Sequence, residues 1–131
     1  MFAAVPSVEK RLEPHLPQVL GSPSQLEMAL INLVVNAIQA MDGEGALTVT
    51  SARRGREVEI AIGDTGPGIP DAIRATLFEP FVTTKPEGKG TGLGLSTVLM
   101  VVEHHRGRID FTSSRGAGTT FHLRLPAATV S

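Results

Sequence analysis

Two kinds of hydrophobic pattern alternate along the 131 residues, and their order constrains the fold more than any other feature. Apolar residues at helical spacing predict three helices, at residues 24–41, 71–78 and 94–105. Alternating apolar and polar residues predict two β-hairpins, one at 46–52 and 57–63 and the other at 108–113 and 119–125. Helices mixed with antiparallel hairpins are typical of an α+β fold, in which helices cover one face of a sheet.

The segment before the first helix is rich in proline, with four of the nine prolines among residues 1–23. It is expected to form short extended pieces at 8–12 and 18–20, joined by turns. Ser24 and Glu27 fit a capping box, which predicts the start of the first helix. That helix is expected to stop at Asp42-Gly43.

Composition excludes several classes of protein. A chain of this length is expected to form a single domain over residues 1–131. The formal net charge of −1, without a basic block, argues against broad nucleic-acid binding. The absence of cysteine excludes disulfides and thiolate metal sites. No apolar run approaches the roughly 20 residues of a membrane span, so no membrane contact is expected from this domain.

Two asparagines interrupt the apolar pattern of the first helix. Asn32 and Asn36 are four residues apart and therefore share one face, and Gln25 and Gln39 continue the same stripe. This stripe could simply face solvent. Asparagine is a poor helix former, however, so the alternative is a groove wall that offers amide oxygens to a hard cation such as Mg²⁺.

A carboxylate followed by two glycines comes directly after a predicted strand. Asp64 could be an ordinary turn residue. It could instead accept a hydrogen bond from a ligand amine, with Gly66 and Gly68 leaving room for a flat ring.

A glycine-rich segment opens the helix predicted at 94–105. Half of the 14 glycines fall between Gly63 and Gly94, and residues 83–91 are expected to form a mobile loop. Backbone N–H groups at such a helix start can bind phosphate, although a flexible linker would have the same composition. Lys85 and Lys89 precede the segment and could reach a terminal phosphate or remain solvated.

Taken together and in this order, five motifs resemble the ATP-binding catalytic domain of sensor histidine kinases, which belongs to the GHKL superfamily with DNA gyrase. The motifs are Asn32-Leu-Val-Val-Asn36-Ala37, Asp64-Thr-Gly66-Pro-Gly68, Phe78-Glu-Pro-Phe81, Gly90-Thr-Gly92-Leu-Gly94-Leu and Gly116-Ala-Gly118-Thr119-Thr-Phe121. The resemblance extends to Thr83-Thr84-Lys85 with a short following loop, which is similar to the nitrogen-regulation and dicarboxylate-sensing kinases. The resemblance implies a two-layer α/β sandwich with a mixed sheet and ATP held beneath a mobile lid.

The resemblance also implies a set of site residues. The nucleotide-binding residues would be Asn32, Asn36, Asp64, Gly66, Gly68, Ile69, Phe81, Thr84, Lys85, Gly90, Thr91, Gly92, Leu93, Gly94, Leu95 and Thr119. Asn36 would coordinate Mg²⁺, and Asp64 would accept the adenine amino group, with Thr119 completing the adenine contact through water. Asn32 and Lys85 would have the catalytic roles, at the phosphate site and the terminal phosphate respectively.

Two departures shape the expected function. No phosphoacceptor motif is present, so a histidine on a separate dimerisation domain would receive the phosphate. Asn32 also stands where the gyrase-like members have Glu, and a neutral amide cannot act as a base toward water. Both features favour a phosphotransferase over the alternatives, which are a GHKL ATPase, an anti-sigma-type serine kinase and a nucleotide-sensing module.

The resemblance implies partners and a location as well. The phosphoacceptor domain of the same kinase and a downstream response regulator would be the partners, and the protein would form homodimers only through the phosphoacceptor domain. This domain would be cytoplasmic, whether or not the parent protein is anchored in a membrane.

Overall fold

A computed structural model describes residues 7–41, 45–79 and 94–128 of the chain. The elements follow one another as β1 (Ser7–Leu12), α1 (Pro23–Ala40), β2 (Ala46–Arg54), β3 (Glu57–Asp64), η1 (Asp71–Thr76), α2 (Gly94–His104), β4 (Arg108–Ser114) and β5 (Gly118–Pro126). The predicted helices and hairpins are therefore present, in the predicted order. The extended piece predicted at 8–12 is confirmed, as part of β1, and the piece predicted at 18–20 belongs to no strand of the sheet.

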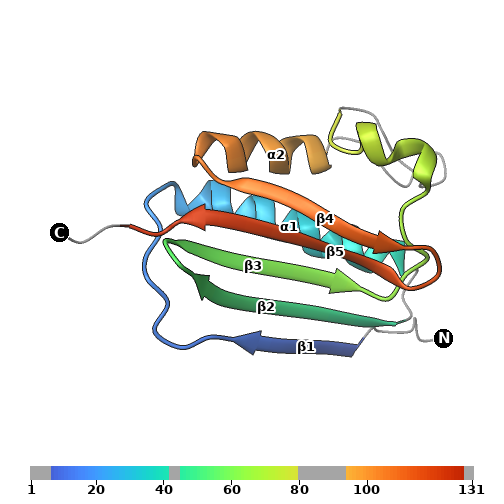
Figure 1. The fold of residues 1–131 in the computed structure, drawn as a ribbon, viewed down its shortest axis with the longest axis horizontal. Helices are drawn as coiled ribbons and strands as arrows, with labels where there is room; N and C mark the ends of the chain where they lie inside the picture. The colour runs from blue at the N-terminus through green and yellow to red at the C-terminus, as the bar shows by residue number, and fades with distance from the viewer. Residues whose placement is uncertain (1–6, 42–44, 80–93, 129–131) are drawn as a thin grey trace.

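The five strands form one mixed sheet in the order β1-β2-β3-β5-β4 (Figure 1). β2 with β3 and β4 with β5 are the two predicted antiparallel hairpins, and β3 pairs with β5 to join them. β1 adds to the edge in parallel with β2, which makes the sheet mixed. The expected α+β class is confirmed.

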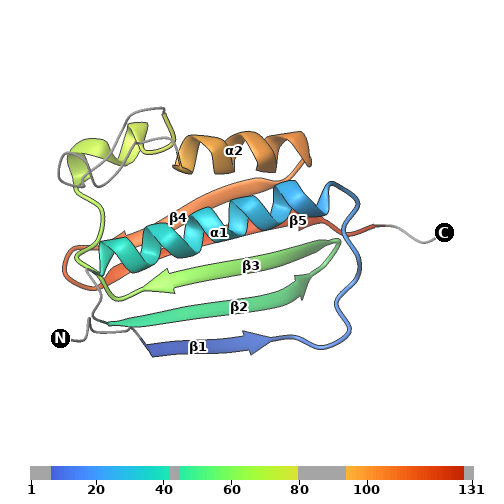
Figure 2. The same cartoon turned by 180° about the vertical axis from the view of Figure 1, so that it is seen from behind.

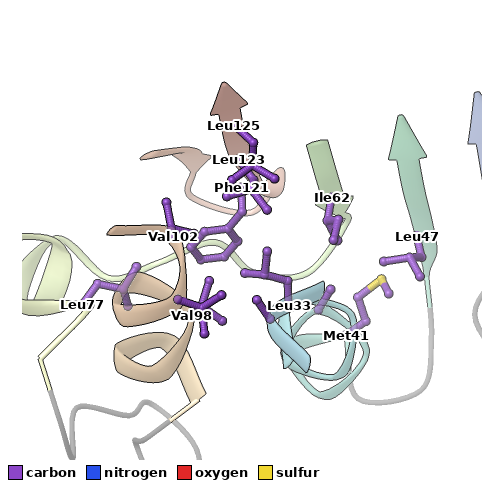
Figure 3. Packing of buried hydrophobic residues seen from close by; sticks show 13 residues of the cluster. Leu33, Met41, Leu47, Ile62, Leu77, Val98, Val102, Phe121, Leu123 and Leu125 are labelled. Carbon is purple, nitrogen blue, oxygen red and sulfur yellow. The ribbon is translucent and has the colours of Figure 1, made fainter. Parts of the chain in front are cut away.

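Both long helices cover the same face of the sheet, as the two opposite views show (Figures 1 and 2). The core lies between these layers, where Leu33 of α1 and Val98 of α2 meet Ile62 and Phe121 of the sheet (Figure 3). Phe78 contacts the rings of Phe111 and Phe121, with both centroid distances 6.2 Å, and so packs against this core.

The start of α1 differs from the prediction. Ser22, rather than Ser24, is the N-cap, and its side-chain oxygen accepts a hydrogen bond from the backbone N–H of Gln25. The reason is Pro23, which occupies the first helical turn, where a missing N–H costs nothing and a fixed φ suits the helix. The predicted capping box is therefore wrong, because it places the cap two residues late.

Two other boundaries differ from the sequence reading. The predicted short helix at 71–78 is a 3₁₀ helix, η1, that ends at Thr76. The last residue of α1 is Ala40, and the predicted stop at Asp42-Gly43 lies outside the described residues.

His105 ties the end of α2 to the beginning of α1. Its ring is buried, its Nδ1 lies 2.8 Å from the carbonyl oxygen of Val101, and its Nε2 accepts the backbone N–H of Ser22 at 3.0 Å. Both ring nitrogens are satisfied when the imidazole is neutral and carries its proton on Nδ1. This histidine therefore has a structural role.

Candidate nucleotide-binding site

The candidate site begins at Asp64, the last residue of β3. Asp64 lies directly opposite Leu47 on β2 and Thr119 on β5, so the three side chains share one face of the sheet. Leu47 belongs to the core, which identifies this as the face that the helices cover. The Asp64 side chain is thus directed into the space between the sheet and the helices, and the residue is only 8% exposed.

The surroundings of the Asp64 carboxyl set its protonation. Burial raises its pKa above the usual value, while backbone hydrogen bonds from Gly66 and Thr119 oppose that rise by favouring the ionised form. The Gly66 N–H donates to Oδ1 at 2.9 Å. A buried carboxylate that can accept further hydrogen bonds is suited to accept one from a ligand amine.

The loop after Asp64 is held by the hairpin of β4 and β5. The N–H of Gly116 donates to the carbonyl of Pro67 at 2.8 Å. Gly68 has a φ of +87°, and a Cβ there would lie 2.6 Å from the carbonyl oxygen of Ser114. Gly118 has a φ of +99°, and a Cβ there would collide with the carbonyl of Asp64. Glycine is required at both positions because two backbones approach each other.

This packing adds a reason for the glycines that the sequence did not reveal. A Cβ on Gly66 would lie 3.0 Å from the carbonyl oxygen of Ala40, at the end of α1. The glycine motif therefore serves the contact between this loop, α1 and the hairpin. Room for a flat ring at Gly66 and Gly68 stays a prediction.

The two asparagines lie on α1. Asn32 and Asn36 are both partly buried, whereas Gln25 and Gln39 of the same stripe are exposed. The asparagines are therefore not simply solvated, although the structure does not test their predicted contacts with phosphate or metal. Among the described residues, no group of three or more His, Cys, Asp or Glu side chains could hold a metal ion.

The remaining predicted residues divide into two groups. Gly94 and Leu95 are the first residues of α2, and Ile69 packs against the core, so these three are described. The residues outside the described ranges are Phe81, Thr84, Lys85, Gly90, Thr91, Gly92 and Leu93, together with the predicted mobile loop at 83–91.

Sequence reasoning missed Ser113 and Arg74. The hydroxyl of Ser113 accepts the N–H of Ile69 at 2.8 Å and lies 3.0 Å from the Thr119 hydroxyl. Arg74 donates to the Ser113 carbonyl at 2.7 Å, and its guanidinium lies 5.9 Å from the centre of the Phe111 ring. In the sequence, a serine near the end of a strand gives no signal, because the contact with Ile69 spans 44 positions.

A shallow hollow of about 380 Å³ lies elsewhere, on the outer face of the sheet. Among the residues that line the hollow, three lie side by side on neighbouring strands, Thr48, Gly63 and Thr120. Each is next in sequence to a residue of the row that contains Asp64, so these three face the opposite side of the sheet. Of the predicted nucleotide-binding residues that the structure describes, only Asp64 contributes to its lining. The hollow is therefore distinct from the site that the sequence predicts.

A comparison with protein families decides what kind of domain carries this arrangement. Residues 21–129 match the family described as histidine kinase-, DNA gyrase B- and HSP90-like ATPases. The chain belongs to this family. The match extends from the N-cap of α1 past the end of β5 and contains every described residue of the predicted site.

The curated relatives of this domain are larger proteins. Over 111 residues, or 85% of this chain, it is 43% identical to the sensor histidine kinase ZraS of Escherichia coli K12, of which it covers 23%. In an alignment of 125 positions that covers 87% of this chain, it is 40% identical to the sensory histidine kinase/phosphatase NtrB of Klebsiella oxytoca, of which it covers 35%. The chain thus spans about a quarter to a third of these relatives. The likeness to nitrogen-regulation kinases is confirmed.

Solved structures agree with the expected sandwich. The mycobacterial sensor histidine kinase MprB superposes with a TM-score of 0.81 at 32% identity, covering 95% of this chain and 83% of that chain. Full-length ShkA in complex with AMPPNP gives a TM-score of 0.82 at 28% identity, covering 95% of this chain and 26% of that one. None of the described helices is long and apolar enough to cross a membrane.

Proposed function

We propose that this domain binds MgATP and presents the γ-phosphate to a histidine on a separate phosphoacceptor domain, as part of a two-component sensor kinase. The observation that carries the proposal is the buried Asp64 carboxylate at the end of β3, next to Thr119 and facing the helix layer. An acceptor in this position suits the exocyclic amino group of adenine. The relatives named as sensor histidine kinases and the AMPPNP complex of ShkA support the choice of ligand and reaction.

The phosphate and metal contacts are assigned to α1 and the start of α2. Asn36 presents a neutral, partly buried oxygen donor, which suits Mg²⁺ bound to phosphates. When bound, the ion would neutralise phosphate charge during transfer. Gly94 at the N-terminus of α2 would contribute backbone N–H groups and the positive end of the helix dipole. Lys85 would approach the terminal phosphate.

The residue that carries the phosphate is proposed to lie outside this domain. Asn32 cannot activate water, which disfavours rapid hydrolysis. His104 follows Glu103 but ends α2, whereas the phosphates would lie at Gly94, where α2 begins. At about 1.5 Å per residue, the two ends of this helix are roughly 15 Å apart, too far for in-line transfer within one molecule.

The wider assignments rest on the same proposal. Residues 1–131 would be one catalytic domain, and the dimerisation domain of the same kinase would supply both the histidine and the homodimer contact. A response regulator would receive the phosphate from that histidine, and the catalytic domain would work in the cytoplasm.

A transfer assay tests the proposal. The domain is incubated with γ-labelled ATP and Mg²⁺, alone and with the phosphoacceptor domain of ZraS, the relative 43% identical over the matched region. Because transfer depends on matched partners, any phosphoacceptor domain encoded in the same gene is tested in parallel. Label that is stable to base and labile to acid should appear on the phosphoacceptor domain only.

Two controls make the result decisive. The Asp64→Asn variant should lose transfer together with ATP binding, and a phosphoacceptor domain whose histidine is replaced by glutamine should stay unlabelled. Rapid labelling of the isolated domain at His104 would overturn the assignment of the acceptor. Steady phosphate release without transfer to any phosphoacceptor domain would identify an ATPase instead.

A further inference from the structure

Ser113 joins the two segments that flank the proposed adenine site. It lies on β4 directly opposite Thr119 on β5, and Asp64 on β3 lies directly opposite Thr119 on the other side. The three side chains therefore form one row on the inner face of the sheet. Ser113 is the member of this row to which the sequence motifs give no role.

The Ser113 hydroxyl is at the centre of a small hydrogen-bond network. It accepts the N–H of Ile69 at 2.8 Å, and it lies 3.0 Å from the Thr119 hydroxyl and 3.3 Å from the carbonyl oxygen of Gly118. A hydroxyl has one proton to donate. Ser113 can therefore donate to Thr119 or to Gly118, and the closer oxygen is that of Thr119.

The acceptor to which Ser113 donates determines whether the Thr119 hydroxyl can donate a hydrogen bond to a ligand. When Ser113 donates to the Thr119 oxygen, the proton of Thr119 is free to point away from Ser113. The site then contains an acceptor at Asp64 and a donor at Thr119. A water that accepts from Thr119 keeps both of its protons, one for Asp64 and one for N1 of adenine, while Asp64 also accepts the adenine amino group. Guanine instead presents an acceptor to Asp64 and an N–H at N1.

We propose that Ser113 is a positioning residue for nucleotide specificity, which fixes the Thr119 hydroxyl as a donor toward N1 of adenine through a bridging water. The backbone of Ser113 is itself held in place, because Arg74 of η1 donates to its carbonyl at 2.7 Å. This inference rests on the proposed function, since it takes the ligand to be an adenine nucleotide.

The test compares ATP with 1-deaza-ATP, in which a C–H replaces N1, by calorimetric titration. Ser113→Ala should weaken ATP binding by about 5- to 10-fold, the value of one ordinary hydrogen bond, and leave 1-deaza-ATP binding nearly unchanged. It should also lower the preference for ATP over GTP. Ser114→Ala is the matched control, because Ser114 is the next residue and its side chain is exposed.

A second comparison tests the route through Thr119. In a Thr119→Val background, the further change Ser113→Ala should have no additional effect on ATP affinity. Should Ser113→Ala fail to fold, Ser113→Cys keeps the volume and replaces the hydroxyl by a weak thiol donor, and the same comparisons apply.

The outcomes separate this inference from the proposed function. Equal losses for ATP and 1-deaza-ATP would mean that Ser113 only supports the loop through Ile69, and would overturn the inference. An additional loss in the Thr119→Val background would overturn it too. If the unaltered domain binds neither nucleotide, the proposed function itself fails.

Discussion

Replacing Asp64 by Asn should make the domain more stable at neutral pH while weakening its binding of ATP. The substitution preserves shape, and the Asn side-chain oxygen can still accept the Gly66 N–H that now donates to Oδ1 at 2.9 Å. It removes the negative charge and replaces one acceptor oxygen by an NH₂ donor. Since Asp64 is 8% exposed, water screens that charge poorly, and the free energy of unfolding should respond to its loss.

The pH dependence has a definite sign. Below the usual pKa of 3.8 the carboxyl is neutral in both folded and unfolded chains, so the substitution changes little there. Burial raises the pKa in the folded chain. As the pH rises between these two pKa values, the unfolded chain releases the proton first, and the unfolding free energy of the original domain falls. Above the pKa of the folded chain, the unfolding free energy of the original domain stays at its lowered value. The stability advantage of the variant should therefore appear above pH 3.8 and level off at higher pH.

The effect on ATP is opposite in direction. A hydrogen bond from the adenine amino group to a carboxylate contributes about 1.5–3 kcal/mol, so its loss should lower ATP affinity by about 10- to 150-fold. The Asn amide can instead donate to the carbonyl of guanine, so affinity for GTP should fall less than affinity for ATP.

Urea unfolding from pH 3 to 8 and calorimetric titration of both nucleotides measure the two effects. Asp110→Asn is the matched control, because it makes the same change at a carboxylate 61% exposed on β4. If the unfolding free energies of the Asp64 variant and the original domain change in parallel with pH, burial does not raise the pKa of Asp64 and the reasoning is refuted. Unchanged ATP affinity in the folded variant would refute the role of Asp64 in the site.

Three further predictions concern other parts of the domain. His105→Phe should lower the unfolding free energy by about 2–4 kcal/mol in denaturant titrations, because the ring no longer forms its hydrogen bonds with Ser22 and Val101. His104→Phe, at the exposed neighbouring position, should change it by less than about 0.5 kcal/mol. Asn36→Ala should weaken MgATP binding at least about 10-fold and leave adenosine binding in EDTA nearly intact, and equal losses would point to helix damage. Gly118→Ala should cost at least about 3 kcal/mol by thermal and urea unfolding, because its Cβ would meet the Asp64 carbonyl, whereas Gly116→Ala, with φ +76° and open space, should cost about 1 kcal/mol.

The sequence by itself determined the order and type of the main elements. Helical and strand periodicities depend on residues within one or two turns, so they can be read locally, and they predicted α1, α2 and both hairpins. The Asp64 and Gly118 motifs likewise marked the two loops that meet beside the proposed site. The boundary at Ser22 was less secure, because two serines, Ser22 and Ser24, are candidates for one cap and the position of Pro23 distinguishes them.

The tertiary structure decided the pairings between distant segments. The parallel pairing of β1 with β2 joins a strand that precedes α1 in the sequence to one that follows it, and no local pattern specifies it. The apolar residues of α1 also left open which side would be buried. Packing on the sheet and α2 buries Ala29, Leu33 and Ala37, and Ile31 is left 53% exposed.

The same reason applies to Ser113. Its contacts with Ile69 and Thr119 exist only because β5 pairs with both β3 and β4, which brings the Asp64 loop beside the hairpin. Local patterns of apolar and polar side chains can be recognised in the sequence alone. Which hydroxyl meets which N–H across the sheet depends on strand register, and register is chosen by the burial of the whole inner face.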